Sequence, residues 1–244
     1  MKSGDPMRTS ILTAVILVTA TAQAVAASDD LTIVSKNIHN GKPTGNSTSY
    51  LASDHVRMAQ GDGNEMIVDA QTGVMTTLDG KKKTYYTTTR QDVQQMSAKM
   101  AAMMNDPKTQ QGMQMMQKMT GAMAESYEVK DTGVTRQIAG FSCEEWTITM
   151  GGISTTRECL TTALQYPAHA LDVFKEFSQS MQSTMSAFGP MAKASAGLAE
   201  KRKAMKGFSV ATSSATEIMG IKMSEETEVV EVRRGSIPAS TWEI

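Results

Sequence analysis

The residues with the clearest potential for chemistry in this sequence are its two cysteines, Cys143 and Cys159. The glycine pair Gly151-Gly152 lies midway between them and predicts a hairpin. If Met150, Gly151 and Gly152 form a three-residue loop, residue 149 pairs with residue 153 and Cys143 lies directly opposite Cys159. Cysteines that face each other across a hairpin form a disulfide in an oxidising compartment. The alternative is a catalytic or metal-binding thiol pair, although the spacing is not Cys-x-x-Cys and no histidine stands near.

Methionine is the second group with chemical potential, because the chain has 21 methionines while aromatic residues make up only 5%. Four sulfurs cluster at Met113, Met115, Met116 and Met119. Soft thioethers select Cu(I), so a copper site in an envelope metal or stress protein is one interpretation. No histidine or cysteine lies within the cluster, and methionines at helical spacing usually serve as adaptable apolar packing residues. We therefore predict no metal ligand and no cofactor, and keep copper binding as an alternative.

Residues with the spacing of a catalytic site are not found in the sequence. The three histidines, His39, His55 and His169, lie in no nucleophile or zinc motif. Glu144 and Glu145 are adjacent in a predicted strand, so their carboxylates point to opposite faces and form no acid–base pair. We predict that the protein is not an enzyme.

The N-terminus has the three parts of a cleavable secretory signal. Lys2 and Arg8 give a positive start, and the apolar run from Ile11 to Val18 is too short to span a bilayer. Ala24-Val25-Ala26 supplies a cleavage site with small residues. We expect residues 1–26 to be removed, the mature chain to be periplasmic or secreted, and no later segment to span a membrane.

Closely spaced strands separated by turn residues predict a β-meander between residues 31 and 88. Antiparallel pairing is expected because parallel pairing needs long crossovers. The predicted strands are Leu31–Ser35, Thr48–Ala52, His55–Ala59, Glu65–Ala70, Val74–Leu78 and Lys83–Thr88, with a linker at Asn37–Asn46.

Beyond residue 88 the apolar spacing becomes helical. Thr89 and Asp92 resemble a capping box at the start of a first helix, and Asp106-Pro107 begins a second. Another helical insertion follows Pro167. The apolar stripes of these helices are predicted to lie as a lid over a hydrophobic ligand site on the sheet; they comprise Val93, Met96, Met100, Met103, Met113, Met116, Met119, Phe174, Phe177 and Met181.

Strands return after each helical insertion. They are predicted at Ser126–Lys130, Thr135–Ile138, around the Gly151-Gly152 hairpin, at Phe208–Ile218 and at Met223–Val232. The order of strands, helices, strands, helices and strands indicates a single α+β domain over residues 27–244. We predict a curved antiparallel sheet whose concave face is covered by Met-rich helices.

Several segments together resemble a known family. They are His55-Val56-Arg57-Met58, Met66-Ile67-Val68-Asp69, Thr77-Leu78-Asp79, Lys83-Thr84-Tyr85-Tyr86, Gly140-Phe141-Ser142-Cys143-Glu144-Glu145-Trp146 and Glu158-Cys159. The chain resembles a bacterial periplasmic family with a domain of unknown function, which is similar to the lipoprotein carriers of the LolA and LppX type. The resemblance implies a half-barrel that holds acyl chains on its concave side, and it carries over no functional residue.

The sequence therefore favours a non-enzymatic periplasmic carrier for a lipid, a lipoprotein or another hydrophobic partner. Two alternatives stay open: the copper or stress protein, and an interaction module without a small ligand. The net charge of −1 gives no electrostatic reason to expect nucleic acid as a partner.

Overall fold

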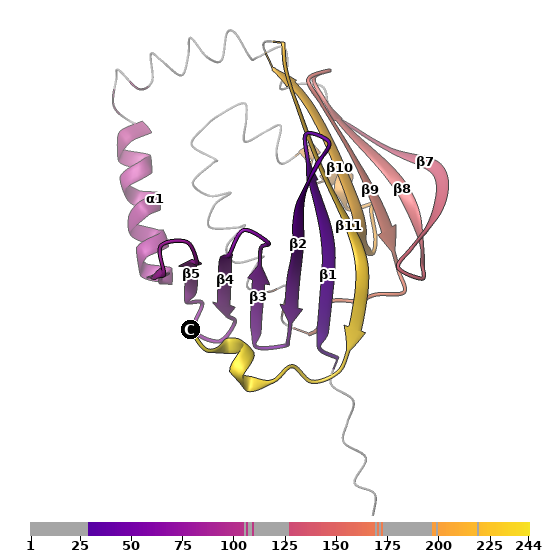
Figure 1. The fold of residues 1–244 in the computed structure, drawn as a ribbon. Helices are drawn as coiled ribbons and strands as arrows, with labels where there is room; N and C mark the ends of the chain where they lie inside the picture. The colour runs from indigo at the N-terminus through magenta and orange to yellow at the C-terminus, as the bar shows by residue number, and fades with distance from the viewer. Residues whose placement is uncertain are drawn as a thin grey trace, which may run out of the picture.

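The structure is a computed structural model that describes residues 29–104, 127–168, 200–218 and 220–244, with the isolated residues 106, 109, 170, 172, 197 and 198. The described strands form one open antiparallel sheet in the order β6-β5-β4-β3-β2-β1-β11-β10-β9-β8-β7 (Figure 1). The order consists of two meanders that meet where β1 pairs with β11. Strands β6 and β7 therefore form the two edges of the sheet.

The first meander follows the predicted strands closely. Its strands are β1 (Leu31–His39), β2 (Lys42–Leu51), β3 (His55–Ala59), β4 (Asn64–Asp69), β5 (Met75–Asp79) and β6 (Thr84–Thr88). The predicted linker at Asn37–Asn46 is wrong, because these residues form the β1–β2 hairpin. Its turn is Asn40-Gly41, with φ angles of 50° and 74°. An Asn-Gly pair favours the two positive φ angles that a tight hairpin turn requires.

Two aspartates organise successive turns of this meander. The Asp69 carboxylate accepts hydrogen bonds from the Gln71 and Thr72 backbone N–H groups at 2.8 and 3.0 Å. The Asp79 carboxylate does the same for Lys81 and Lys82 at 3.1 and 3.0 Å. Burial alone would raise the pKa of Asp69, but the bonds from Thr72 and Gln71 hold it below its usual value. For Asp79, the ammonium and backbone N–H of Lys82 lower the pKa.

These lowered pKa values predict acid sensitivity. A carboxyl group whose pKa is lower in the folded state stabilises the fold above its unfolded pKa of about 3.9, and this stabilisation is lost as pH falls through the folded value. We expect the melting temperature to fall below about pH 4. The double variant Asp69→Asn/Asp79→Asn should show a smaller fall, because asparagine keeps an acceptor oxygen but does not titrate. Melting followed by circular dichroism between neutral and acidic pH tests this, and equal acid-induced falls in the two proteins would contradict it.

Helix α1 (Arg90–Met104) follows β6 and begins at the predicted capping box. The Thr89 backbone N–H donates to the Asp92 carboxylate at 2.8 Å, and the Asp92 N–H donates to the Thr89 hydroxyl at 3.2 Å. This reciprocal pair confirms that an aspartate serves in place of the more common glutamate. The other predicted helix stripes, Met113, Met116, Met119, Phe174, Phe177 and Met181, lie outside the described residues.

The second meander returns the chain to the centre of the sheet. Its strands are β7 (Tyr127–Ile138), β8 (Phe141–Met150), β9 (Ser154–Thr161), β10 (Phe208–Ile218) and β11 (Ile221–Arg234). The two strands predicted at Ser126–Lys130 and Thr135–Ile138 are one strand, β7. Its register shifts between Asp131 and Thr135, and the Thr132 hydroxyl at this bulge donates to the Glu145 carbonyl at 2.8 Å.

The core is organised as a row of apolar residues across the first meander. The strand registers align Leu31 with Leu51, Leu51 with Val56, and Val56 with Val68. All four side chains are buried and lie on the same face of the sheet. This alternation fixes which residues of β1–β4 share that face, because a shift of one residue would turn the whole row outward.

The opposite face of β3 carries the C-terminal strap, which we define as residues 235–244. The strap includes the short helix η1 (Ala239–Trp242). In the view of Figure 1 it runs below the strands, from the end of β11 towards β5. The Arg57 guanidinium donates to the Thr241 carbonyl and to the Glu243 carbonyl, the latter at 3.2 Å. The Trp242 ring stacks on His55 with 5.2 Å between ring centroids. The strap therefore joins the end of β11 to β3.

Candidate ligand groove

A groove of about 320 Å³ lies at the centre of the sheet, where the two meanders meet. It is at the lower end of the roughly 300–1,000 Å³ range of small-molecule sites. Its apolar lining consists of Ile33, Leu51, Met58, Phe208, Val210, Ala211 and Val229. Its remaining lining residues carry hydroxyl groups: Ser35, Ser49, Tyr166, Ser209, Thr212 and Thr227.

Strand registers explain why residues so distant in sequence line one groove. On the first meander, Ile33 pairs with Ser49 and Ser49 with Met58, so the three side chains form one row. Across the junction, Ser35 pairs with Val229. This row lies beside the buried Leu31–Val68 row on the same face, so the core forms the base on which the groove residues are held.

Strand β10 contributes the other wall through an irregularity. Its register with β9 shifts between Ser209 and Ala211, which leaves Val210 as an extra residue. The Ser209 hydroxyl donates to the Ala211 carbonyl at 3.3 Å and lies 3.1 Å from the Thr212 hydroxyl. A bulge re-aims side chains that a regular strand would place alternately on two faces. Residues 208–212 therefore all reach the groove.

Tyr166 lines the groove, and an aromatic contact holds its ring. Its ring packs on Phe208 with 4.6 Å between centroids and a 35° angle between ring planes. Burial raises the pKa of the Tyr166 phenol, and the Glu158 carboxylate raises it further. The phenol is therefore neutral at physiological pH. Glu158 itself is paired with Arg202, whose guanidinium nitrogen lies 2.5 Å from the carboxylate.

The described residues of the predicted lid do not line this groove. On α1, Met96 and Met103 are 54% and 67% exposed, and Val93 is half-buried. The Met100 side chain lies outside the described residues. The lid role of these residues stays a prediction. The sheet residue Met58 lines the groove, whereas Val56 and Val68 lie in the core beside it.

Sequence reasoning missed the hydroxyl residues of the groove. Ser49 lies in the predicted strand Thr48–Ala52, and its alternation with Leu51 places both on one face. That period-two pattern was the available signal for Ser49. For Ser209 and Thr212 no comparable signal exists, because the β10 bulge changes which residues share a face.

The predicted disulfide between Cys143 and Cys159 is present, with 5.3 Å between their Cα atoms. The predicted register is wrong by two residues, because Met150 pairs with Ser154 and Cys159 lies opposite Glu145. The cysteines are therefore diagonal neighbours on one face of the β8–β9 hairpin, and both are buried. Cys159 also pairs in register with Ala211 of the groove, so the bond braces the strand next to the groove wall.

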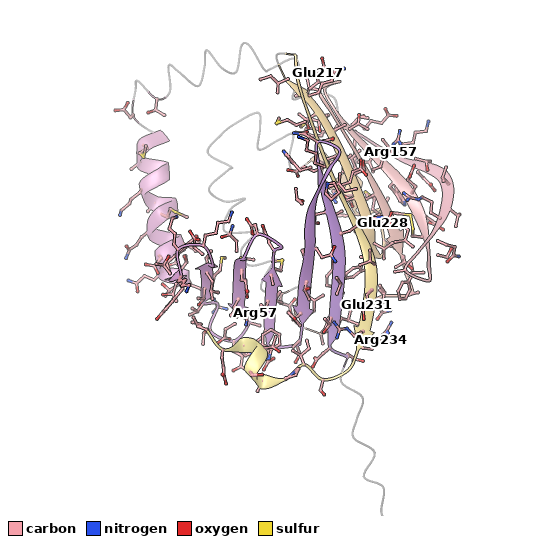
Figure 2. The ribbon with its side chains drawn as sticks, in the orientation of Figure 1. Arg57, Arg157, Glu217, Glu228, Glu231 and Arg234 are labelled. Carbon is pink, nitrogen blue, oxygen red and sulfur yellow. A yellow bond between two sulfur atoms is a disulfide. The ribbon has the colours of Figure 1, made fainter. Side chains whose placement is uncertain are left out.

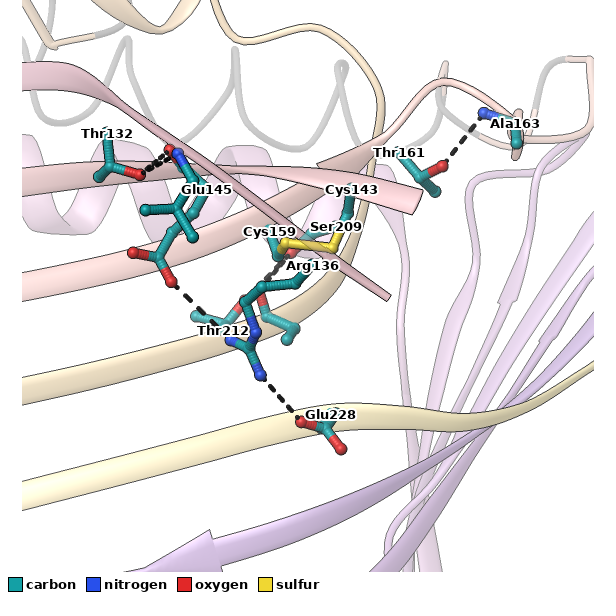
Figure 3. The surroundings of a disulfide bond; sticks show 12 residues. Thr132, Arg136, Cys143, Glu145, Cys159, Thr161, Ala163, Ser209, Thr212 and Glu228 are labelled. Atoms are coloured by element: carbon teal, nitrogen blue, oxygen red, sulfur yellow. Dashed lines mark hydrogen bonds and ion pairs between the residues drawn. A yellow bond between two sulfur atoms is a disulfide. The ribbon is translucent and has the colours of Figure 1, made fainter. Parts of the chain in front are cut away.

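Charged residues lie around the disulfide (Figure 3). The Arg136 guanidinium lies 3.8 Å from the Glu145 carboxylate and 3.5 Å from Glu228. Three strands separate β7, which carries Arg136, from β11, which carries Glu228. Because neighbouring strands lie about 4.8 Å apart, this contact requires the sheet to bend between its β7 edge and its centre.

The described part of the chain holds neither a metal-ligand cluster nor a membrane-spanning helix. Among those residues, no group of three histidine, cysteine, aspartate or glutamate side chains has the arrangement of a metal site. No described helix is long and apolar enough to cross a membrane.

No protein-family model matches the chain, and no curated protein matches it significantly. Solved structures that match the chain include PNGF-II (11% identity, TM-score 0.40) and MucB (12% identity, TM-score 0.38). An uncharacterized conserved protein from Thermus thermophilus has 6% identity and a TM-score of 0.43. The match to PNGF-II covers 88% of this chain and 29% of PNGF-II, and the match to MucB covers 87% of this chain and 55% of MucB. The match to the Thermus thermophilus protein covers 89% of this chain and 85% of that protein. With TM-scores below 0.5, these likenesses carry no functional conclusion.

Proposed function

We propose that the protein is a non-enzymatic binding protein of the bacterial periplasm or the extracellular space, which holds a hydrophobic ligand in the central groove. The single observation that carries this proposal is the groove itself, which apolar and hydroxyl side chains line together on one face of the sheet. The bend between β7 and β11 supports a curved sheet, as in LolA- and LppX-type carriers. The Arg136–Glu228 contact lies on the face opposite to the groove, because Glu228 stands between the lining residues Thr227 and Val229.

The location outside the cytoplasm is supported by two independent features. The N-terminal residues have the pattern of a secretory signal, which precedes a single domain in this proposal. The buried disulfide is typical of proteins that mature in an oxidising compartment.

The exposed methionines of α1 favour a second candidate function. Met96 and Met103 present adaptable apolar side chains to solvent, as in surfaces that accept a protein or lipoprotein partner. The copper alternative depends on Met113, Met115, Met116 and Met119, which lie outside the described residues.

The ligand function is tested by filling the groove. Ser49→Trp places a large ring between Ile33 and Met58, whereas Tyr50→Trp introduces an indole on the opposite face of the same strand, where it replaces a tyrosine ring. We expect a solvatochromic apolar dye to bind the native protein and to be displaced by lipid. Ser49→Trp should weaken dye binding at least about tenfold, equivalent to about 1.4 kcal/mol. Tyr50→Trp should leave it unchanged.

Circular dichroism and the melting temperature show whether each variant is folded. A folded native protein that binds no apolar probe contradicts the proposal. Equal dye affinity in the native protein and a folded Ser49→Trp variant contradicts the assignment to this groove.

A further inference from the structure

Three of the six hydroxyl groups that line the groove, those of Ser209, Thr212 and Thr227, have hydrogen-bond partners within the sheet. When the Ser209 hydroxyl donates its hydrogen to the Ala211 carbonyl at 3.3 Å, the Thr212 hydroxyl is the donor in the 3.1 Å bond between the two side chains. The Thr227 hydroxyl donates to the Asn37 side-chain oxygen at 3.1 Å. Each hydroxyl has one hydrogen and two lone pairs. Thr212 and Thr227 therefore offer acceptor oxygens to a ligand.

The charges in and around the groove favour a neutral headgroup. Among the described residues that line the groove, none carries a charged side chain, and Tyr166 is neutral at physiological pH. Thr212 pairs in register with Glu158, which places a carboxylate beside the Thr212 side of the groove. The cation there, Arg202, is already bound to Glu158 at 2.5 Å. An anionic headgroup would lose its hydration without gaining a cation, which is costly.

We propose that the ligand of this groove is a neutral amphiphile whose headgroup donates hydrogen bonds, such as a monoacylglycerol or an acyl amide with hydroxyl groups. This assignment rests on the proposed binding function and names its ligand class. The acyl chain lies against Ile33, Met58 and Val229, and the headgroup donates to Thr212 and Thr227. A fatty-acid carboxylate is disfavoured because it is charged and cannot donate a hydrogen bond to Thr212 or Thr227.

Four ligands with the same acyl or alkyl chain separate charge from hydrogen-bond donation. The affinity of each ligand is measured by its displacement of the apolar dye from the native protein, at mildly alkaline pH. Each ligand is kept below its micelle concentration or solubility limit. Monolaurin is neutral and donates, methyl laurate is neutral and only accepts, laurate is anionic, and lauryl trimethylammonium is cationic without a donor. We expect monolaurin to bind most tightly, about 3- to 10-fold better than methyl laurate, since one net hydrogen bond contributes about 0.5–1.5 kcal/mol. Laurate should bind at least about tenfold more weakly than monolaurin.

The variant Thr212→Val/Thr227→Val removes both acceptors and keeps the side-chain shape. The test is the ratio of the two affinities within the variant: the preference for monolaurin over methyl laurate should be lost, whatever the affinity of the variant for the dye. Thr48→Val, on the opposite face of β2, is the matched control and should keep that preference.

Two results overturn the assignment while leaving the binding function intact. One is laurate or the ammonium binding as tightly as monolaurin. The other is a preference for monolaurin that survives in the dye-binding double valine variant. A folded native protein that binds no dye overturns the binding function, and the ligand assignment with it.

Discussion

Replacing Cys143 and Cys159 together with alanine is expected to lower the free energy of unfolding by about 3 kcal/mol. The bond closes a loop between residues 16 positions apart, and cross-linking such a loop removes about this much conformational entropy from the unfolded chain. For a chain of this size, the corresponding fall in melting temperature is roughly 6–12 °C. Urea unfolding of the oxidised native protein and of the variant measures the difference.

The position of the disulfide adds a functional expectation. Cys159 pairs with Ala211, next to the β10 bulge that forms a wall of the groove. We therefore expect the double alanine variant to bind the apolar dye more weakly at temperatures where it is still folded. Native protein treated with reductant should behave like the variant in both measurements. Identical unfolding midpoints for oxidised and reduced native protein would contradict the stabilising role of the bond.

For the disulfide, the sequence predicts the bond but not the register of the hairpin that carries it. The cysteine pair and the glycines between them identify the bond, because only one pairing is available within the chain. The register depends on whether the loop is Met150–Gly152 or Gly151–Ile153, and both contain the two glycines. The structure has Met150 opposite Ser154, so the bond is diagonal rather than directly across the hairpin.

Local patterns predicted most of the strands and the start of α1. Turn residues such as Asp69 and Asp79 bind their own backbone neighbours, so their effect is visible in a few consecutive letters. The Asn40-Gly41 turn is equally local, and the error there came from interpreting a polar segment as a linker. The groove differs, because its lining depends on the pairing of β1 with β11 and on a bulge in β10.

Contacts between distant segments were the hardest features to predict. Arg57 binds the carbonyl of a residue 184 positions later, and no periodicity connects the two segments. The alternation of apolar and polar residues around Arg57 predicts a strand, but it does not identify the residues that Arg57 binds. In the structure, β3 presents Arg57 towards the C-terminal strap (Figure 2).

Arg57→Met is expected to detach the C-terminal strap and to lower the free energy of unfolding by about 2–3 kcal/mol. The partly buried guanidinium binds the Glu65 carboxylate, with one nitrogen–oxygen distance of 2.7 Å, and two strap carbonyls. Hydrogen bonds to charged groups contribute about 1.5–3 kcal/mol, and removing the arginine leaves Glu65 without this partner. Methionine keeps most of the apolar stem, so the loss reports the polar contacts. Ile67, which pairs with Arg57 in register and is buried, should become more exposed.

Trp242 provides a direct measure of strap detachment. The chain has two tryptophans, so replacing Trp146 with phenylalanine leaves Trp242 as the sole indole. In that background, Arg57→Met should shift the Trp242 emission to longer wavelength, because the ring leaves His55 and enters water. Arg233→Met is the matched control. Arg233 pairs with Glu231 at 3.1 Å on an exposed part of β11, and such surface pairs contribute about 0–1 kcal/mol.

The two arginine variants separate a specific attachment from a general loss of positive charge. If Arg57 holds the strap, Arg57→Met alone shifts the Trp242 emission, and it does so below the denaturant concentration at which the sheet unfolds. The groove lies on the opposite face of β3, so dye binding should survive detachment of the strap. An unchanged Trp242 emission together with native stability in Arg57→Met would show that the strap is held by the Trp242–His55 stack instead of by Arg57.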